Sequence, residues 1–301
     1  MLLQVLGTAA GGGIPQWNCA CPGCSGARAH PERRRRHASL AVRTDEGRWY
    51  LVNATPDIGD QIEAHLALHP GPGPRQTPIA GVVLTDAELD HTLGIARLRE
   101  AEGLEVLATG PVRQALTDRL RLGEVLGPYT ALTWRELPCH GTQPLTGDAP
   151  GPGVRISAVP VSAKRPRYAA DAPEDDAWVV ALRLYDPVTG RSAVYAPAVA
   201  AWSDALHRVA AEADCVIVDG TFWDDEEPRR TGISSRTATG MGHLPIDGPG
   251  GTAGILATLS ARCLYTHLNN TNPLVDPTAA QHKRLAELGI EVADDEMVIK
   301  L

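Results

Sequence analysis

Short apolar runs alternate with polar turns along most of the 301-residue chain. Runs rich in Val, Ile and Leu predict buried strands, and segments with apolar residues three or four apart predict amphipathic helices. The predicted order is strands first, with helices interleaved, and then the same pattern again. This order predicts an α/β fold in which two mixed sheets pack face to face with helices outside. We expect one domain over 1–301. We expect strands at 2–6, 39–42, 49–53, 79–84, 104–108, 134–137, 154–161, 178–185, 192–196, 214–218, 263–266 and a final strand, 291–293 with 297–301. We expect helices at 58–68, 93–102, 111–121, 203–213, 277–288 and between Pro245 and Leu259.

Polar residues recur where the predicted strands end, at Asp57, Ser162, Asp219, His267 and, most densely, 86–91. In layered α/β folds the loops at strand ends build the functional site. The segment after strand 79–84 supplies three carboxylates and an imidazole, which could converge on one cation. The alternative is a solvated acidic turn before a helix, where the helix dipole favours negative charge.

Composition narrows the function classes. A net charge of −8 and a pI near 5.7 argue against a nucleic-acid-binding surface. No run of about 18 apolar residues predicts a transmembrane helix, and residues 1–7 read as a strand that lacks the charged start of a signal peptide. We therefore expect a cytoplasmic protein whose six cysteines are thiols or metal ligands.

A CxCxxC cluster, Cys19, Cys21 and Cys24, predicts a structural zinc site, with Pro22-Gly23 as the turn between the second and third thiolates. The alternative is a set of unrelated or reactive thiols. His30 and His37 are local candidates for the fourth ligand. The glycine run 11–13 predicts a tight turn beneath a site, and the remaining cysteines, Cys139, Cys215 and Cys263, are expected to be buried small hydrophobes.

Several motifs resemble known families. Residues 86–91 resemble the HxHxDH signature of the metallo-β-lactamase superfamily, an αββα sandwich, with its two leading histidines replaced by Asp86 and Glu88. Thr266-His267 resembles the superfamily's last histidine. The CxCxxC insert is like that of a branch that includes a phosphonate-pathway phosphodiesterase. The stretches 11–19, 53–58, 218–221, 241–244 and 267–273 are similar to the coenzyme PQQ synthesis protein B family, over essentially the whole chain.

The resemblance implies a metal site with fewer ligands than the two-metal members of the superfamily have. The first metal of two-metal members would lose all its imidazoles, since 161–163 holds no histidine, and Pro197-Ala198 stands where the bridging carboxylate should follow. Asp90, His91 and His267 remain. Two histidines and one carboxylate with open positions are typical of non-haem Fe(II) oxygenases, whereas hydrolysis on this fold needs two metals or a zinc hydroxide held by several imidazoles.

The family resemblance implies an Fe(II)- and O2-dependent hydroxylase in pyrroloquinoline quinone (PQQ) biosynthesis, acting on the tyrosine ring of a Glu-Tyr unit cut from the precursor peptide. Other divalent metals could substitute for Fe(II). We expect a homodimer and contacts with other PQQ pathway proteins. Two alternatives stay open: a carrier of PQQ or its precursor towards the periplasm, and a metal-dependent hydrolase.

Further residues are candidates with alternatives. Asp86 and Glu88 could ligate the metal or orient a ligand. Asp219, at the end of a buried strand, could be a ligand, a ligand's partner or a base. His243, between glycines, could be a general acid or base, a substrate contact or a helix cap.

The substrate and zinc sites are less defined. Ser162, Lys164 and Arg165 could bind a substrate carboxylate or belong to an exposed loop. In the phosphodiesterase-like relatives the fourth zinc ligand is a histidine where this chain has Asn270. An amide oxygen is a poor zinc ligand, so Asn270, a local histidine or a water could complete the shell.

Overall fold

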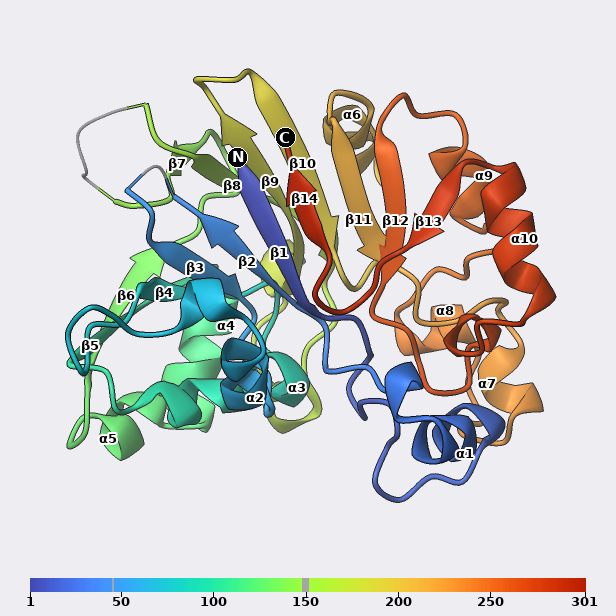
Figure 1. Ribbon diagram of the computed structural model, residues 1–301, viewed down its shortest axis with the longest axis horizontal. Coiled ribbons are helices and arrows are strands. Elements are labelled where there is room, and N and C mark those ends of the chain that lie inside the picture. The colour runs from blue at the N-terminus through green and yellow to red at the C-terminus, as the bar shows by residue number, and fades with distance from the viewer. Residues whose placement is uncertain (45, 148–151) are drawn as a thin grey trace.

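A computed structural model describes residues 1–44, 46–147 and 152–301. Two seven-stranded mixed sheets pack face to face with helices outside, which confirms the predicted αββα sandwich (Figure 1). The first sheet runs β14 (Val298–Lys300), β1 (Leu2–Gly7), β2 (Ser39–Arg43), β3 (Trp49–Val52), β4 (Ile79–Val83), β5 (Gly103–Ala108) and β6 (Ala131–Glu136). The second runs β13 (Ile290–Val292), β12 (Arg262–Thr266), β11 (Cys215–Asp219), β10 (Arg191–Ala196), β9 (Val179–Asp186), β8 (Arg155–Ser162) and β7 (Gln143–Pro144).

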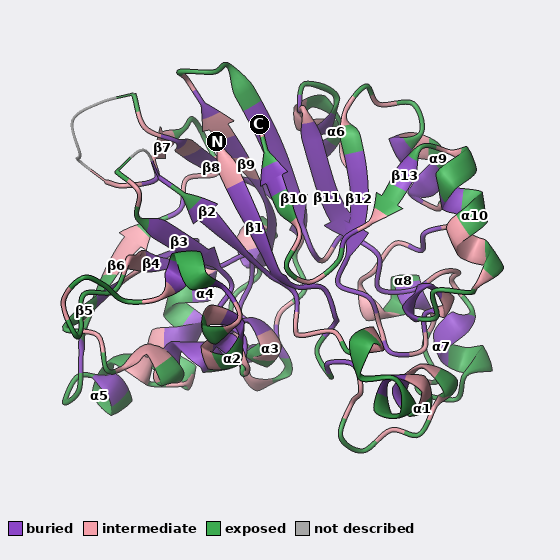
Figure 2. Ribbon diagram, viewed as in Figure 1, coloured by how far each residue is buried: buried purple, intermediate pink, exposed green. Residues whose placement is uncertain are grey.

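Alternation along the strands builds two cores. In β2, Leu40 and Val42 face the second sheet, whereas Ala41 between them belongs to the outer core under the helices. Successive side chains of a strand point to opposite faces. Because both faces of the central strands are covered, their residues are buried almost throughout (Figure 2). This explains why the strands read as short apolar runs with little polar alternation.

The helices are shorter than the sequence predicts. They are α1 (Pro22–Ala29), α2 (Ile58–Glu63), α3 (Leu89–Thr92), α4 (Gly110–Gln114), α5 (Leu122–Leu126), α6 (Asp204–Ala211), α7 (Glu227–Arg230), α8 (Ala238–Met241), α9 (Ala253–Leu256) and α10 (Ala280–Glu287). The helix expected at 58–68 stops because His65 is extended, and Leu66–Leu68 then forms a separate 3-10 turn. The helix expected at 93–102 is a 3-10 segment, Leu93–Leu98, and the one at 111–121 changes into a π turn at Ala115–Arg119.

Two chain segments differ from prediction in kind. Pro22-Gly23 does not form a turn between cysteines but starts α1, where proline is tolerated because its missing N–H would have no helical partner. The expected final strand is divided between the two sheets, since β13 pairs with β12 whereas β14 pairs with β1. Among the described helices, none is long and apolar enough to cross a membrane.

Strand ends from both sheets meet at one edge of the sandwich. Strands β3 and β4 are parallel neighbours, as are β11 and β12, so each pair delivers its following residues to the same edge. The glycine-rich segment after β1 crosses between them: Leu268 N donates to Thr8 O at 2.8 Å, and Ala10 N donates to Leu268 O at 2.8 Å. This edge lies below the strands in Figure 1, beside α2 and α3.

Candidate metal centre

Asp90, His91 and His267 converge at this edge, each offering an atom within 4.8 Å of the others. Asp90 and His91 lie on α3, and His267 directly follows β12. Oδ2 of Asp90 lies 3.7 Å from Nε2 of His91 and 3.7 Å from Nε2 of His267. His267 has a φ of 59°, a left-handed conformation that non-glycine residues seldom adopt outside functional or turn positions.

Both imidazoles present an unsatisfied nitrogen to Asp90. His91 and His267 are 2% and 5% exposed, and their Nε2 atoms are buried without a hydrogen-bond partner among the described residues. A buried polar atom without a partner is costly and points to an absent group. Two imidazole nitrogens and a carboxylate oxygen aimed at one point fit a divalent metal with open coordination positions.

Asp86 contacts the ring nitrogen of His91 that faces away from Asp90. Nδ1 of His91 lies 2.7 Å from Oδ2 of Asp86, whose two oxygens also accept from Thr85 Oγ1 at 2.8 Å and from Glu88 N at 2.9 Å. A carboxylate at one ring nitrogen directs the other towards a metal. Burial alone would lower the pKa of His91, but Asp86 and Asp90 outweigh it and raise that pKa to about 9. Asp86 contributes no atom to the cluster, so its position matches the orienting alternative.

A second hydrogen-bonded group backs His267. Its Nδ1 lies 2.8 Å from Thr221 Oγ1, which is 2.6 Å from Oδ1 of Asp219, and Oδ2 of that carboxylate lies 2.7 Å from Nδ1 of His243. The rings of His243 and His267 stack with centroids 5.7 Å apart. Asp219, His243 and His267 are also close enough to hold an ion. Because the facing atoms of Asp219 and His243 already hydrogen-bond each other, this group is better described as support for His267.

Glu88 and Lys164 form an ion pair beside the cluster. Nζ of Lys164 lies 3.6 Å from Oε1 of Glu88, and both side chains are about two-fifths exposed. Burial and the nearby Asp86 and Asp90 raise the pKa of Glu88 although Lys164 opposes them. A Cβ added at Gly242 would lie 2.9 Å from Cδ of Lys164, so the lysine stem crosses the segment before His243.

The other predicted substrate residues take local roles. The hydroxyl of Ser162 accepts from Lys164 N at 3.1 Å, and Ser162 lines a cavity of about 280 Å³ that includes none of the metal candidates. Arg165 donates to Ala172 O at 2.6 Å, which holds its own loop. Of Ser162, Lys164 and Arg165, Lys164 alone pairs with a residue next to the metal cluster, namely Glu88.

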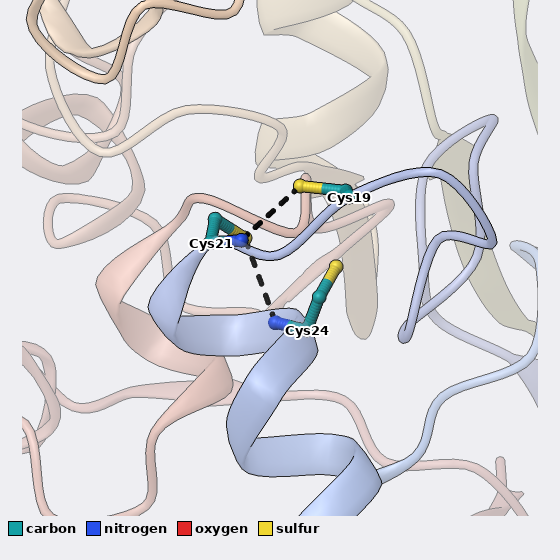
Figure 3. A group of neighbouring side chains, drawn as sticks. All are labelled: Cys19, Cys21 and Cys24. Carbon is teal, nitrogen blue, oxygen red and sulfur yellow. Dashed lines mark hydrogen bonds between the residues drawn. The ribbon is translucent and has the colours of Figure 1, made fainter.

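The three cysteines gather at the start of α1 (Figure 3). Backbone N–H groups point at their sulfurs: Cys21 N lies 3.4 Å from Cys19 Sγ, Cys24 N lies 3.5 Å from Cys21 Sγ, and Gln16 N lies 3.2 Å from Cys24 Sγ. Such donors stabilise thiolate charge. The cluster therefore fits a tetrahedral zinc that lacks one ligand.

Asn270 reaches the cysteines through the wrong atom for a ligand. Its amide Nδ2 donates to Cys24 Sγ at 3.0 Å, and its backbone oxygen lies 3.3 Å from Cys21 Sγ. His30 and His37 do not belong to the cysteine cluster. Nδ1 of His30 lies 3.5 Å from Oε1 of Glu32, and Nδ1 of His37 lies 3.1 Å from Oδ2 of Asp57. Among the other cysteines, Cys215 and Cys263 are buried as expected, but Cys139 is only partly buried.

Two residues that contribute to the site, Thr221 and Tyr168, carry no recognisable signal in the sequence. Thr221 lies within the 218–221 motif, but its position in the sequence does not show that its hydroxyl bridges Asp219 and His267. Tyr168 donates to Ala87 O at 2.6 Å and ties the 164–176 segment to the ligand-bearing turn. A Cβ added at Gly11 would lie 3.0 Å from Asp90 Oδ2, so the glycine run passes directly over the cluster. Gly13 N donates to Ala10 O at 2.9 Å, which forms the tight turn that the sequence predicts at a site.

The comparisons with known proteins agree with this geometry. A model described as a beta-lactamase superfamily domain matches residues 48–268, and the two-sheet sandwich with its histidine-carboxylate cluster at the strand ends places the chain in the metallo-β-lactamase superfamily. The chain is 41% identical over 310 residues to Coenzyme PQQ synthesis protein B of Azoarcus sp. (strain BH72), covering 100% of both. It is 41% identical to the protein of that name from Cupriavidus necator, covering 99% of both. The crystal structure of Zn(2+)-bound PqqB from Methylobacterium extorquens superposes with a TM-score of 0.89 at 32% identity, covering 100% of both. The chain belongs to the coenzyme PQQ synthesis protein B family.

Proposed function

We propose that this protein acts in PQQ biosynthesis as an Fe(II)- and O2-dependent hydroxylase of the tyrosine ring in the Glu-Tyr precursor unit. The observation that carries the proposal is the Asp90, His91 and His267 cluster, in which two buried Nε2 atoms without partners face one carboxylate oxygen. These three residues would hold the metal. The chemistry that Fe(II) would supply when bound there is the activation of O2.

The surroundings favour oxygenation over hydrolysis. Hydrolysis on this fold needs a second metal or several imidazoles around a zinc hydroxide. Of the residues at the other metal's position, Asp86 is committed to His91, Glu88 pairs with Lys164, and Ser162 accepts from a backbone N–H. The position of the superfamily's first metal therefore offers no imidazole ligand among these three residues.

Two side chains are placed to handle the substrate. Lys164 is a partly exposed cation whose partner, Glu88, a substrate carboxylate could replace. His243 commits Nδ1 to Asp219, which leaves its Nε2 to exchange a proton with a phenolic substrate. We assign substrate binding to Lys164 and general acid-base catalysis to His243.

The cysteine cluster serves a separate purpose in this proposal. Cys19, Cys21 and Cys24 would hold a structural Zn²⁺, and the hydrogen bond from Asn270 to Cys24 would join this N-terminal loop to the loop after β12. The fourth ligand would be a water or another group, with Asn270 donating to Cys24. The expected homodimer and the contacts with other PQQ pathway proteins stay predictions.

Anaerobic reconstitution tests the function. Protein loaded with Fe(II) and then given O2 and Glu-Tyr is expected to consume O2 and release a hydroxylated product, and His267→Ala is expected to do neither. Absence of O2 uptake by the loaded wild-type protein would refute the hydroxylase. Tight PQQ binding by metal-free protein would then support the carrier, and turnover of a phosphodiester with Zn²⁺ would support the hydrolase.

A further inference from the structure

One buried carboxylate, Asp219, contacts His243 directly and is linked to His267 through the hydroxyl of Thr221. Its side chain accepts four hydrogen bonds. Oδ2 accepts from Val199 N at 2.8 Å and from His243 Nδ1 at 2.7 Å, and Oδ1 accepts from Thr221 N at 2.9 Å and from Thr221 Oγ1 at 2.6 Å. Asp219 is 1% exposed, so these contacts replace its hydration.

The direction of each hydrogen bond at Thr221 Oγ1 follows from the number of protons available. A threonine hydroxyl has one proton, and its shortest contact, at 2.6 Å, is with a carboxylate that can only accept. Thr221 Oγ1 must then accept at its two other contacts, the 3.1 Å contact with Nδ1 of His243 and the 2.8 Å contact with Nδ1 of His267. Nδ1 of His267 therefore carries a proton, and in the neutral ring Nε2 is left with its lone pair towards Asp90.

We infer that Thr221 is a positioning residue of the metal centre: its hydroxyl links Asp219 to His267 and fixes His267 in the tautomer whose Nε2 can bind a metal. His91 is held differently, since the carboxylate of Asp86 contacts its Nδ1 directly. The inference rests on the metal centre of the proposed function and does not depend on its oxygen chemistry.

Metal affinity provides the first test, with Mn²⁺ alone as the probe. Mn²⁺ prefers oxygen and imidazole ligands to thiolates, so the cysteine cluster competes little. Loss of a residue that orients a ligand typically lowers affinity 10–100-fold. Thr221→Val is therefore expected to weaken Mn²⁺ binding, measured by electron paramagnetic resonance, by about tenfold or more, and Thr221→Ser is expected to restore most of it.

Thr266→Val is the matched control. Thr266 precedes His267 in the chain, and its buried hydroxyl has no hydrogen-bond partner among the described residues, so its removal is expected to change Mn²⁺ affinity little. Wild-type affinity in Thr221→Val, or a serine variant as weak as the valine variant, would overturn the inference. So would an equal loss in Thr266→Val.

A second readout needs no variant. Nitrogen-15 NMR of the metal-free wild-type protein, with histidine labelled, reports which ring nitrogen of His267 is protonated. The inference requires protonated Nδ1 and unprotonated Nε2; the opposite tautomer would overturn it even if Thr221→Val failed to fold. Neither readout uses O2 or Glu-Tyr, so failure of the hydroxylase proposal would leave both results interpretable.

Discussion

Metal binding is expected to compete with a proton on His91. Asp86 and Asp90 raise the pKa of His91 to about 9 against the effect of burial, so the metal-free protein carries an imidazolium at neutral pH. A metal needs the Nε2 lone pair and must displace that proton. Metal affinity should therefore rise with pH until His91 deprotonates by itself, and should then level off.

The size of the effect follows from the pKa. At pH 7, about two units below the pKa of His91, proton competition lowers the apparent affinity about 100-fold, or about 2.7 kcal/mol. The affinity should rise about tenfold per pH unit between about pH 7 and 9. The stability of the metal-free protein should change in the opposite direction. The contribution of His91 is complete below its ordinary pKa of 6.5 and is lost as pH rises through about 9.

Calorimetric Mn²⁺ titration in buffers of different ionisation enthalpy counts the protons released. We expect about one per metal at pH 7 and nearly none well above pH 9. Asp86→Asn should shift the steep region to lower pH and weaken binding at high pH by roughly 10–100-fold. Asp57→Asn is the matched control, because it removes a second histidine-carboxylate pair, with His37, outside the metal cluster. A pH-independent affinity with no proton release at pH 7 would refute the reasoning.

Three further outcomes are expected. His267→Ala should lose the metal of the Asp90 site but keep the cysteine-bound zinc, because the two clusters share no ligand; elemental analysis that shows both metals lost would contradict separate sites. Lys164→Met should raise KM for Glu-Tyr about tenfold or more and change kcat less, since in the proposed role its ammonium group would bind the substrate equally in the ground and transition states. Steady-state kinetics that show the loss in kcat alone would contradict that role. Burial raises the pKa of Glu227 to about 7 from 4.5, so its contribution to stability is complete below pH 4.5 and is lost as pH rises to about 7. Glu227→Gln should remove this pH dependence, which amounts to roughly 1–3 kcal/mol between pH 4.5 and 7, and an unchanged slope in urea unfolding would count against it.

Much of the architecture could be read from the sequence because burial leaves a local signal. Central strands covered on both faces appear as apolar runs, and the residues that follow them are polar because they face a site. The convergence of Asp90 and His91 with the distant His267 followed from a motif resemblance together with strand-end placement, and the structure brings these three residues together.

What the sequence could not provide depends on tertiary contacts. The Thr221 bridge needs Asp219 and His267 from neighbouring strands, and no spacing rule encodes a hydroxyl's direction. The division of the last residues between β13 and β14 depends on which sheet edge each one reaches. The atom that Asn270 turns towards Cys24 is likewise set by packing. The short helices are held against the sheets by burial, so helix propensity predicts their ends poorly.

The most direct test of the account is the source of oxygen in the product. Fe(II)-loaded protein is mixed anaerobically with Glu-Tyr and then exposed to oxygen-18-labelled O2, and the peptide is analysed by mass spectrometry. We predict a ring-hydroxylated product that carries label from O2, formed by the wild-type protein and absent with His267→Ala. An unmodified peptide, or a hydroxylated product equally abundant with His267→Ala, would contradict it.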